Sequence, residues 1–149
     1  MSIIISQNKD HLINNNLIKK LNNVFLIICD EEQLSDYSIN LKITSDQEMK
    51  DLNNRFRNKN SPTNVLSFTN EDISKNITRN LGDIAINYEY VEREAKEFNK
   101  TFDNHMIHML IHGIYHILGF GHENDEMADI MENKEILLLK KLNINNPYT

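Results

Sequence analysis

The chain has 149 residues, 40% of them hydrophobic, and its 22 acidic and 16 basic side chains give a formal net charge of −6. This length predicts one domain, residues 1–149, with a sizeable core. The negative charge excludes attraction of nucleic acid by the overall field, so RNA binding would need a local basic patch. The single cysteine, Cys29, excludes an internal disulfide, and no segment is typical of a membrane span or a secretory signal, so we expect a cytoplasmic protein.

The first part of the chain predicts strands and helices in alternation. A β-branched run at residues 2–6 indicates a short strand, and apolar residues at helical spacing indicate a helix over residues 9–29. Alternating apolar and polar residues predict a half-buried strand at residues 37–43. Ser45 is the expected N-cap of a helix over residues 46–56.

The middle of the chain predicts two more strands. A polar turn at residues 58–64 leads into a strand at residues 65–68. Residues 70–80 are polar and predict an exposed loop. Residues 81–86 predict the fourth strand, in which Gly82 permits a bulge or a close backbone approach.

The last part predicts three helices, over residues 88–99, 102–118 and 125–142, and a frayed tail at 143–149. The helix at 102–118 is apolar on most sides and is expected near the centre of the fold. In the last helix, the residues expected to face inward are Met127, Ile130, Met131, Ile136, Leu137 and Leu138. The fold class is therefore α+β, a small layered domain in which about five helices pack on a sheet of about four mixed strands.

Three histidines at the end of the central helix have the spacing of a metal site. His112 and His116 are four residues apart, so a helix presents both imidazoles on one face. Gly119 permits the helix to end and the chain to turn back, which brings His122 round as a third ligand. Three imidazoles with a position open to water are typical of catalytic zinc. The sequence therefore predicts one zinc ion per chain at the end of this helix.

The residue after the first ligand bears on the kind of chemistry. Metzincin peptidases share the histidine spacing but carry glutamate at this position as general base. Here the position is Gly113, which cannot accept a proton, so the peptidase interpretation lacks its base. Hydrolysis of amides, esters or phosphodiesters stays open, because the metal site alone does not choose among them.

Several residues near the histidines have more than one interpretation. His108, one turn before His112, supports the site, faces the substrate or lies on the surface. Glu123, Asp125 and Asp83 are candidates for a carboxylate that orients an imidazole. For Glu123 and Asp125, a solvated acidic helix start is the favoured interpretation.

A basic stretch precedes the third strand. Arg55, Arg57 and Lys59 lie close together in an otherwise acidic chain. A guanidinium can hold a phosphate with two hydrogen bonds and stabilise the charge of a phosphoryl-transfer transition state. A solvated basic turn is the alternative, and these residues alone favour it.

Three stretches of the chain stand out as motifs: HGIYHILGFGH at residues 112–122, RNKNSPTNVLSF at 57–68 and LGDI at 81–84. Together they resemble the histidine signature, the second block and the third block of the YbeY family of bacterial endoribonucleases. The chain departs from the family pattern at Gly121, where Asp is usual, at Phe120, where Tyr is common, and at Asn58, where Gly is favoured. These departures concern the surroundings of His122 and the turn that presents Arg57.

The resemblance implies a single-strand-specific, metal-dependent endoribonuclease of 16S rRNA 3′-end maturation and ribosome quality control. Single-stranded RNA, the small ribosomal subunit and its assembly proteins are the implied partners. His112, His116 and His122 carry over as zinc ligands, and Arg57 as the active-site arginine that neutralises developing charge. The nucleophile stays open between water and a 2′-hydroxyl. The alternatives are a zinc-dependent peptidase or small-molecule hydrolase, and a non-catalytic zinc-containing ribosome-assembly factor.

Overall fold

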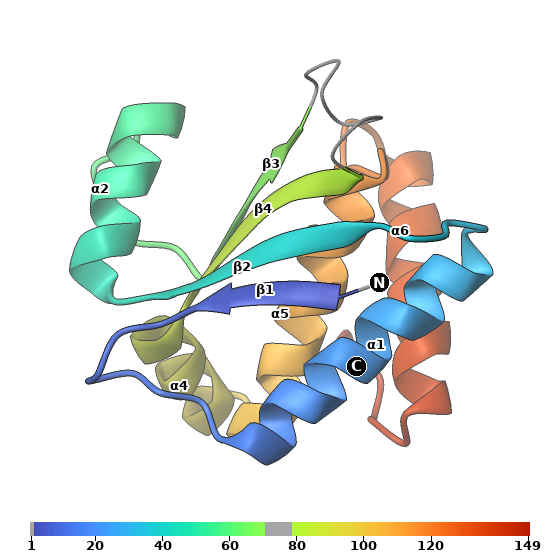
Figure 1. The fold of residues 1–149 in the computed structure, drawn as a ribbon, viewed down its shortest axis with the longest axis horizontal. Helices are drawn as coiled ribbons and strands as arrows, with labels where there is room; N and C mark the ends of the chain where they lie inside the picture. The colour runs from blue at the N-terminus through green and yellow to red at the C-terminus, as the bar shows by residue number, and fades with distance from the viewer. Residues whose placement is uncertain (1, 71–78) are drawn as a thin grey trace.

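The computed structural model describes residues 2–70 and 79–149, in which a four-stranded sheet is packed by helices (Figure 1). The strands are β1 (Ser2–Ser6), β2 (Ser38–Thr44), β3 (Val65–Thr69) and β4 (Asn80–Asn87). The helices are α1 (Asn15–Glu31), α2 (Asp46–Arg57), α4 (Tyr88–Glu97), α5 (Phe102–Ile117) and α6 (Asp125–Lys141). Within the described residues, the α+β class, the four mixed strands and the five helices are confirmed. The expected loop at 70–80 falls almost wholly outside the described residues.

The sheet has the strand order β1-β2-β4-β3. β1 pairs with β2 and β2 with β4 in parallel, whereas β3 pairs with β4 in antiparallel orientation. β3 is therefore an edge strand. The expected close approach at Gly82 is confirmed, because a Cβ at this residue would lie 2.3 Å from the carbonyl oxygen of Phe68.

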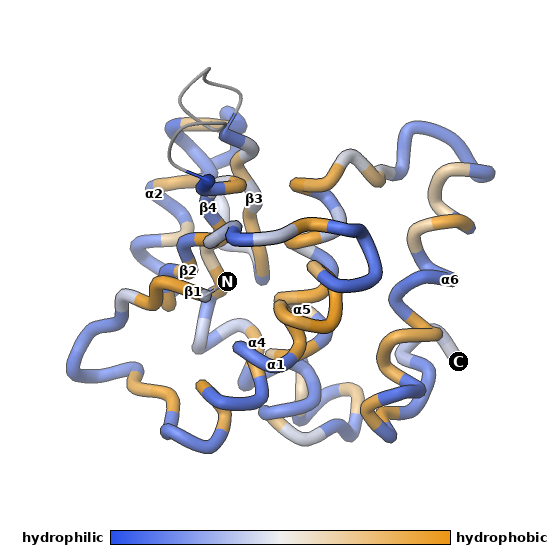
Figure 2. Tube along the Cα trace, turned by 45° about the vertical axis from the view of Figure 1, so that its right-hand side comes forward, coloured by the Kyte–Doolittle hydropathy of each residue, from blue (hydrophilic) through white to orange (hydrophobic). Residues whose placement is uncertain are grey.

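The main core lies between one face of the sheet and helices α1, α5 and α6. α5 runs through its centre, as expected, and its trace is largely hydrophobic (Figure 2). A smaller cluster of Met49, Leu66 and Ala85 lies beneath α2 on the opposite face. Because side chains alternate along β4, Ile84 and Ile86 face α5 while Ala85 faces α2.

The predicted start of the first helix was wrong. α1 begins at Asn15, not near residue 9, because Asn8 Oδ1 accepts hydrogen bonds from the backbone of Asp10 and His11 and holds this segment in a turn. The helix then starts at Asn14, whose side chain accepts from the backbone N–H of Leu17 at 2.8 Å.

The inward face of α6 was predicted only in part, since Met131 and Leu138 are buried as expected but two other residues are exposed. Ile130 and Leu137 are 47% and 62% exposed. The buried residues of this helix are Met131, Glu135, Leu138 and Leu139. The tail is not frayed throughout, since the hydroxyl of Tyr148 donates to Glu135 Oε2 at 2.9 Å. No helix in the described part of the chain has the length and apolarity needed to cross a membrane.

Candidate metal centre

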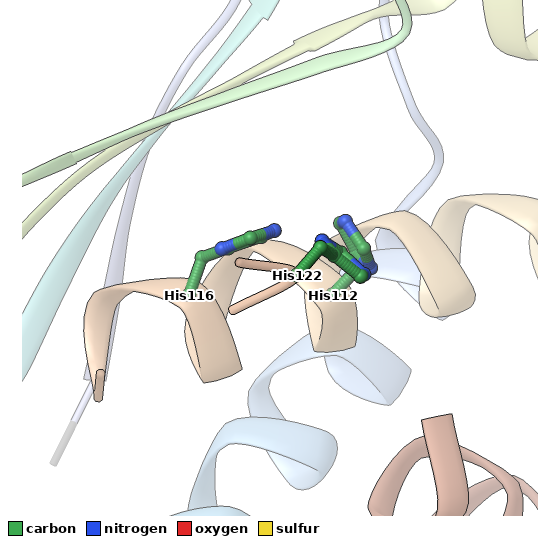
Figure 3. Close-up of side chains that lie close together, drawn as sticks. All are labelled: His112, His116 and His122. Atoms are coloured by element: carbon green, nitrogen blue, oxygen red, sulfur yellow. The ribbon is translucent and has the colours of Figure 1, made fainter. Parts of the chain in front are cut away.

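The three predicted ligands lie together at the C-terminal end of α5 (Figure 3). Their candidate donor atoms are all within 4.8 Å of one another. The ring centroids are 4.6 Å apart for His112 and His116, 5.3 Å for His112 and His122, and 5.0 Å for His116 and His122. Helix α5 ends at Ile117, and Gly119, with φ of 104°, turns the chain back so that His122 approaches from the following loop.

This donor set fits a divalent metal ion. Small side-chain rotations would bring three nitrogens this close to metal–nitrogen bond lengths of about 2.0–2.1 Å. Burial lowers the pKa of His116, and the neighbouring His112 and His122 lower it further. The neutral imidazole is the form that binds metal, so the environment favours the state that a ligand needs.

Glu135, on α6, is the residue that the sequence did not single out. It is fully buried, and its Oε1 lies 3.1 Å from Nδ1 of His112 and 3.0 Å from Nε2 of His108. Burial raises the pKa of this carboxyl, but hydrogen bonds and positive charge from the two histidines outweigh burial and lower the pKa to about 2. An ionised carboxylate only accepts hydrogen bonds, so both imidazoles donate. In the neutral form of His112, Nδ1–H donates to Glu135 and Nε2 keeps its lone pair for a metal.

His108 supports the site and does not lie on the surface. It is 7% exposed, and its Nε2 contacts the same oxygen of Glu135 that His112 contacts. The hydroxyl of Tyr148 completes this group by donating to the second carboxylate oxygen. Burial, together with the negative charge of Glu135, raises the pKa of Tyr148, so the hydroxyl stays protonated and remains a donor.

The carboxylates considered from sequence lie elsewhere. Asp83 accepts a hydrogen bond from Asn40 at 2.8 Å and lines a groove with Leu52 and Phe56, on the α2 side of the sheet. Asp125 is exposed in the first turn of α6, where a negative charge favours the helix N-terminus. Glu123 is exposed, and its carboxylate lies over Gly121. A Cβ at Gly121 would be 2.5 Å from Glu123 Oε2. The aspartate that the family pattern has at this position would therefore fit only if the Glu123 side chain moved.

Arg57, at the end of α2, lines a cavity at the edge of the sheet that two of the histidines also line. Its Nη2 donates to the carbonyl oxygen of Ser67 at 3.1 Å, and its guanidinium lies 5.1 Å from the ring centroid of Phe68. Arg57, His112 and His116 line one cavity of about 360 Å³ along β3. Arg55 does not line this cavity.

Asn58 stands where the family pattern favours glycine, yet the turn after Arg57 has the conformation that a glycine would adopt. Asn58 has φ of 57° and ψ of 30°, the left-handed conformation that glycine adopts most readily and asparagine tolerates. Its backbone N–H donates to the carbonyl oxygen of Asn53, which caps α2. The asparagine therefore ends the helix at the same residue that a glycine would.

Gly113 lets α5 pack directly against the sheet. A Cβ at this position would lie 3.1 Å from Ile84 and 3.2 Å from Oγ of Ser67, and that Oγ donates to the Gly113 carbonyl oxygen at 3.2 Å. Any side chain at this position would press on Ile84 and Ser67 and would require them to shift.

The chain is similar along nearly its whole length to proteins named Endoribonuclease YbeY. Residues 3–143 match the family model of that description. Endoribonuclease YbeY of Francisella philomiragia subsp. philomiragia is 40% identical over 149 residues, covering 97% of this chain and 92% of that protein. Its namesake from Francisella tularensis subsp. tularensis is 43% identical over 129 residues, 82% of this chain and 78% of that protein. The solution structure of TM1509 from Thermotoga maritima superposes with a TM-score of 0.62 at 28% identity, covering 95% and 91% of the two chains.

Proposed function

Because the chain belongs to the Endoribonuclease YbeY family, we propose that it is a metal-dependent endoribonuclease that cleaves single-stranded RNA. Its role is in 16S rRNA 3′-end maturation and ribosome quality control in the cytoplasm, with the small ribosomal subunit and its assembly proteins as partners. Residues 1–149 act as one domain. The observation that carries the proposal is the cavity shared by Arg57, His112 and His116, because it puts a phosphate-binding group beside a metal-binding group.

The metal is proposed to be zinc, one ion per chain, held by His112, His116 and His122. Bound there, it supplies Lewis-acid polarisation of a phosphoryl oxygen and acidifies water. Glu135 keeps His112 in the tautomer that can bind, through the hydrogen bond at 3.1 Å. This role of Glu135 requires only that the carboxylate stay ionised, which its lowered pKa favours.

Arg57 is proposed as the catalytic residue that holds the phosphate. Its hydrogen bond to Ser67 and its position over Phe68 direct the guanidinium along β3, toward the cavity that His112 and His116 line. A guanidinium can contact two non-bridging oxygens at once and offset the charge that develops on them. The nucleophile is either water or the 2′-hydroxyl of the substrate.

The test combines metal analysis with cleavage of an unstructured RNA and of the same sequence in a duplex. We expect one zinc per chain, cleavage of the single strand only, and loss of both zinc and cleavage in His116→Ala. The end groups identify the nucleophile, since a cyclic phosphate requires 2′-hydroxyl attack. Full cleavage in the presence of a chelator, or zinc-dependent cleavage of a peptide library without RNA cleavage, would refute the proposal.

A further inference from the structure

A second cavity adjoins the metal centre on the side away from Arg57. Its volume is about 430 Å³, within the range of small-molecule sites, and it lies between α4, α5 and the C-terminal residues. Three residues, Asn64, Val65 and His112, line both this cavity and the one that contains Arg57. A strand whose phosphate lies beside Arg57 and the histidines therefore has this second cavity beside its neighbouring nucleoside.

The cavity presents aromatic rings that are not buried in the fold. Phe98 and Tyr148 both line it, and they are 50% and 43% exposed. Of the described phenylalanine and tyrosine residues, only these two and Phe56 are exposed. Unstacked bases bind to such rings in single-strand recognition, where stacking is tolerant of sequence.

The cavity wall contains one carboxylate, Glu94, which can accept a hydrogen bond from a ligand. Glu94 Oε1 accepts from Nδ2 of Asn64 at 3.0 Å, and it lies 3.1 Å from Nε2 of the buried His105. No described residue donates to its second oxygen, Oε2. A carboxylate held in this way offers a fixed acceptor to an amino group, as Glu does to the N4 amino group of cytosine.

We propose that this cavity is a base subsite. It binds the nucleoside next to the scissile phosphate, stacks it on Phe98 and Tyr148, and prefers bases with an exocyclic amino group over uracil, which has none. The proposal rests on the ribonuclease function proposed above. It also gives a physical cause for single-strand specificity, because a base can enter only after it leaves the helical stack.

The experiment uses zinc-loaded protein and single-stranded oligoribonucleotides that differ only in the bases flanking the cut. At one flanking position we expect adenosine, cytidine or guanosine to give cleavage about tenfold faster than uridine, within the range of one base-edge contact. Glu94→Gln should reduce this ratio to below about twofold, whereas Glu92→Gln, the same charge change at an exposed position of α4, should keep it. Phe98→Ala should raise KM about tenfold for every base, and Leu137→Ala should not.

A second measurement does not depend on cleavage. In NMR titrations, 5′-CMP should shift signals of Phe98 and His105 at lower concentration than 5′-UMP, and Glu94→Gln should remove the difference. Cleavage by the wild type at equal rates for all four bases would overturn the subsite and leave the ribonuclease function standing. If the wild type cleaves no RNA, the proposed function fails, and the titrations decide on the cavity: preferential CMP binding supports it, and unshifted signals overturn it.

Discussion

Glu135 and His112 are joined by a hydrogen bond of 3.1 Å between Oε1 and Nδ1, although they lie on different helices and 23 residues apart in sequence. The bond ties the orientation of the first candidate ligand to the packing of α6 against α5. It also orients that imidazole before any metal arrives. The metal affinity of the site should therefore depend on a residue that does not touch the metal.

Glu135→Gln should weaken zinc binding at least about tenfold, since loss of such a supporting hydrogen-bond partner typically costs 10- to 100-fold. The glutamine keeps the volume of the side chain but provides a weaker, neutral acceptor for His112. Competition against a chromophoric zinc chelator measures the affinity. Asp129→Asn, an equal charge change at an exposed position of α6, is the control and should bind as the wild type does. Equal affinities in the two variants would contradict the role of Glu135.

The metal-free protein should lose stability in acid partly through Glu135. Its pKa falls from 4.5 to about 2 on folding, so it stabilises the fold above pH 4.5 and loses that contribution as the pH falls toward 2. Between pH 7 and pH 3.5 the lost part is roughly 1 kcal/mol. Urea unfolding of wild type and Glu135→Gln across this range measures it. The stability difference between them should shrink by that amount, and a constant difference would show that Glu135 does not titrate in this way.

Arg57→Ala should lower kcat/KM for RNA cleavage about 100-fold, the effect of removing one electrostatic contact to a transition state. Its zinc content should equal that of the wild type, because Arg57 is not a ligand. Arg55→Ala removes a neighbouring charge outside the cavity and should change the rate less than about twofold, as expected of an exposed cation. Equal losses in the two variants would indicate a general effect of positive charge on RNA binding.

Gly82→Ala should destabilise the protein by about 3 kcal/mol, because its Cβ would lie 2.3 Å from a backbone oxygen and its φ of 148° disfavours a side chain. Gly121→Ala is the matched substitution. There the Cβ would meet only the mobile end of Glu123, so the cost should stay below about 1 kcal/mol. Chemical unfolding followed by circular dichroism gives both values. A smaller loss for Gly82→Ala than for Gly121→Ala would contradict the close approach seen between β3 and β4.

The histidine cluster could be predicted because its geometry is local. His112 and His116 are one helical turn apart, and Gly119 ends the helix within reach of His122, so short-range rules specify all three positions. The central place of α5 followed from its apolar composition for the same reason. Arg57 lies on another element across the sheet, and only the family resemblance joined it to the histidines.

Glu135 could not be found in this way, because its burial depends on partners from another helix. In sequence it is a charged residue next to Lys134 and is typical of a solvated face. Assigning the face of α6 from apolar residues alone turned Ile130 and Leu137 inward, whereas the buried face contains the carboxylate. Periodicity detects hydrophobicity, and it has no means of recognising a buried charge that two imidazoles stabilise.

Ser67 accepts from Arg57 through its carbonyl oxygen and donates to Gly113 through its hydroxyl, so one residue of an edge strand connects the guanidinium to the histidine helix. The proposed phosphate-binding residue and the helix of the proposed metal ligands are therefore linked through Ser67. The guanidinium of Arg57 would already be oriented when the substrate binds. Little reorganisation of the site would then be needed in the transition state. Replacing Ser67 by alanine would keep the carbonyl oxygen that accepts from Arg57 and remove only the hydroxyl bond to Gly113, so it would weaken the link between β3 and the histidine helix without changing any charge.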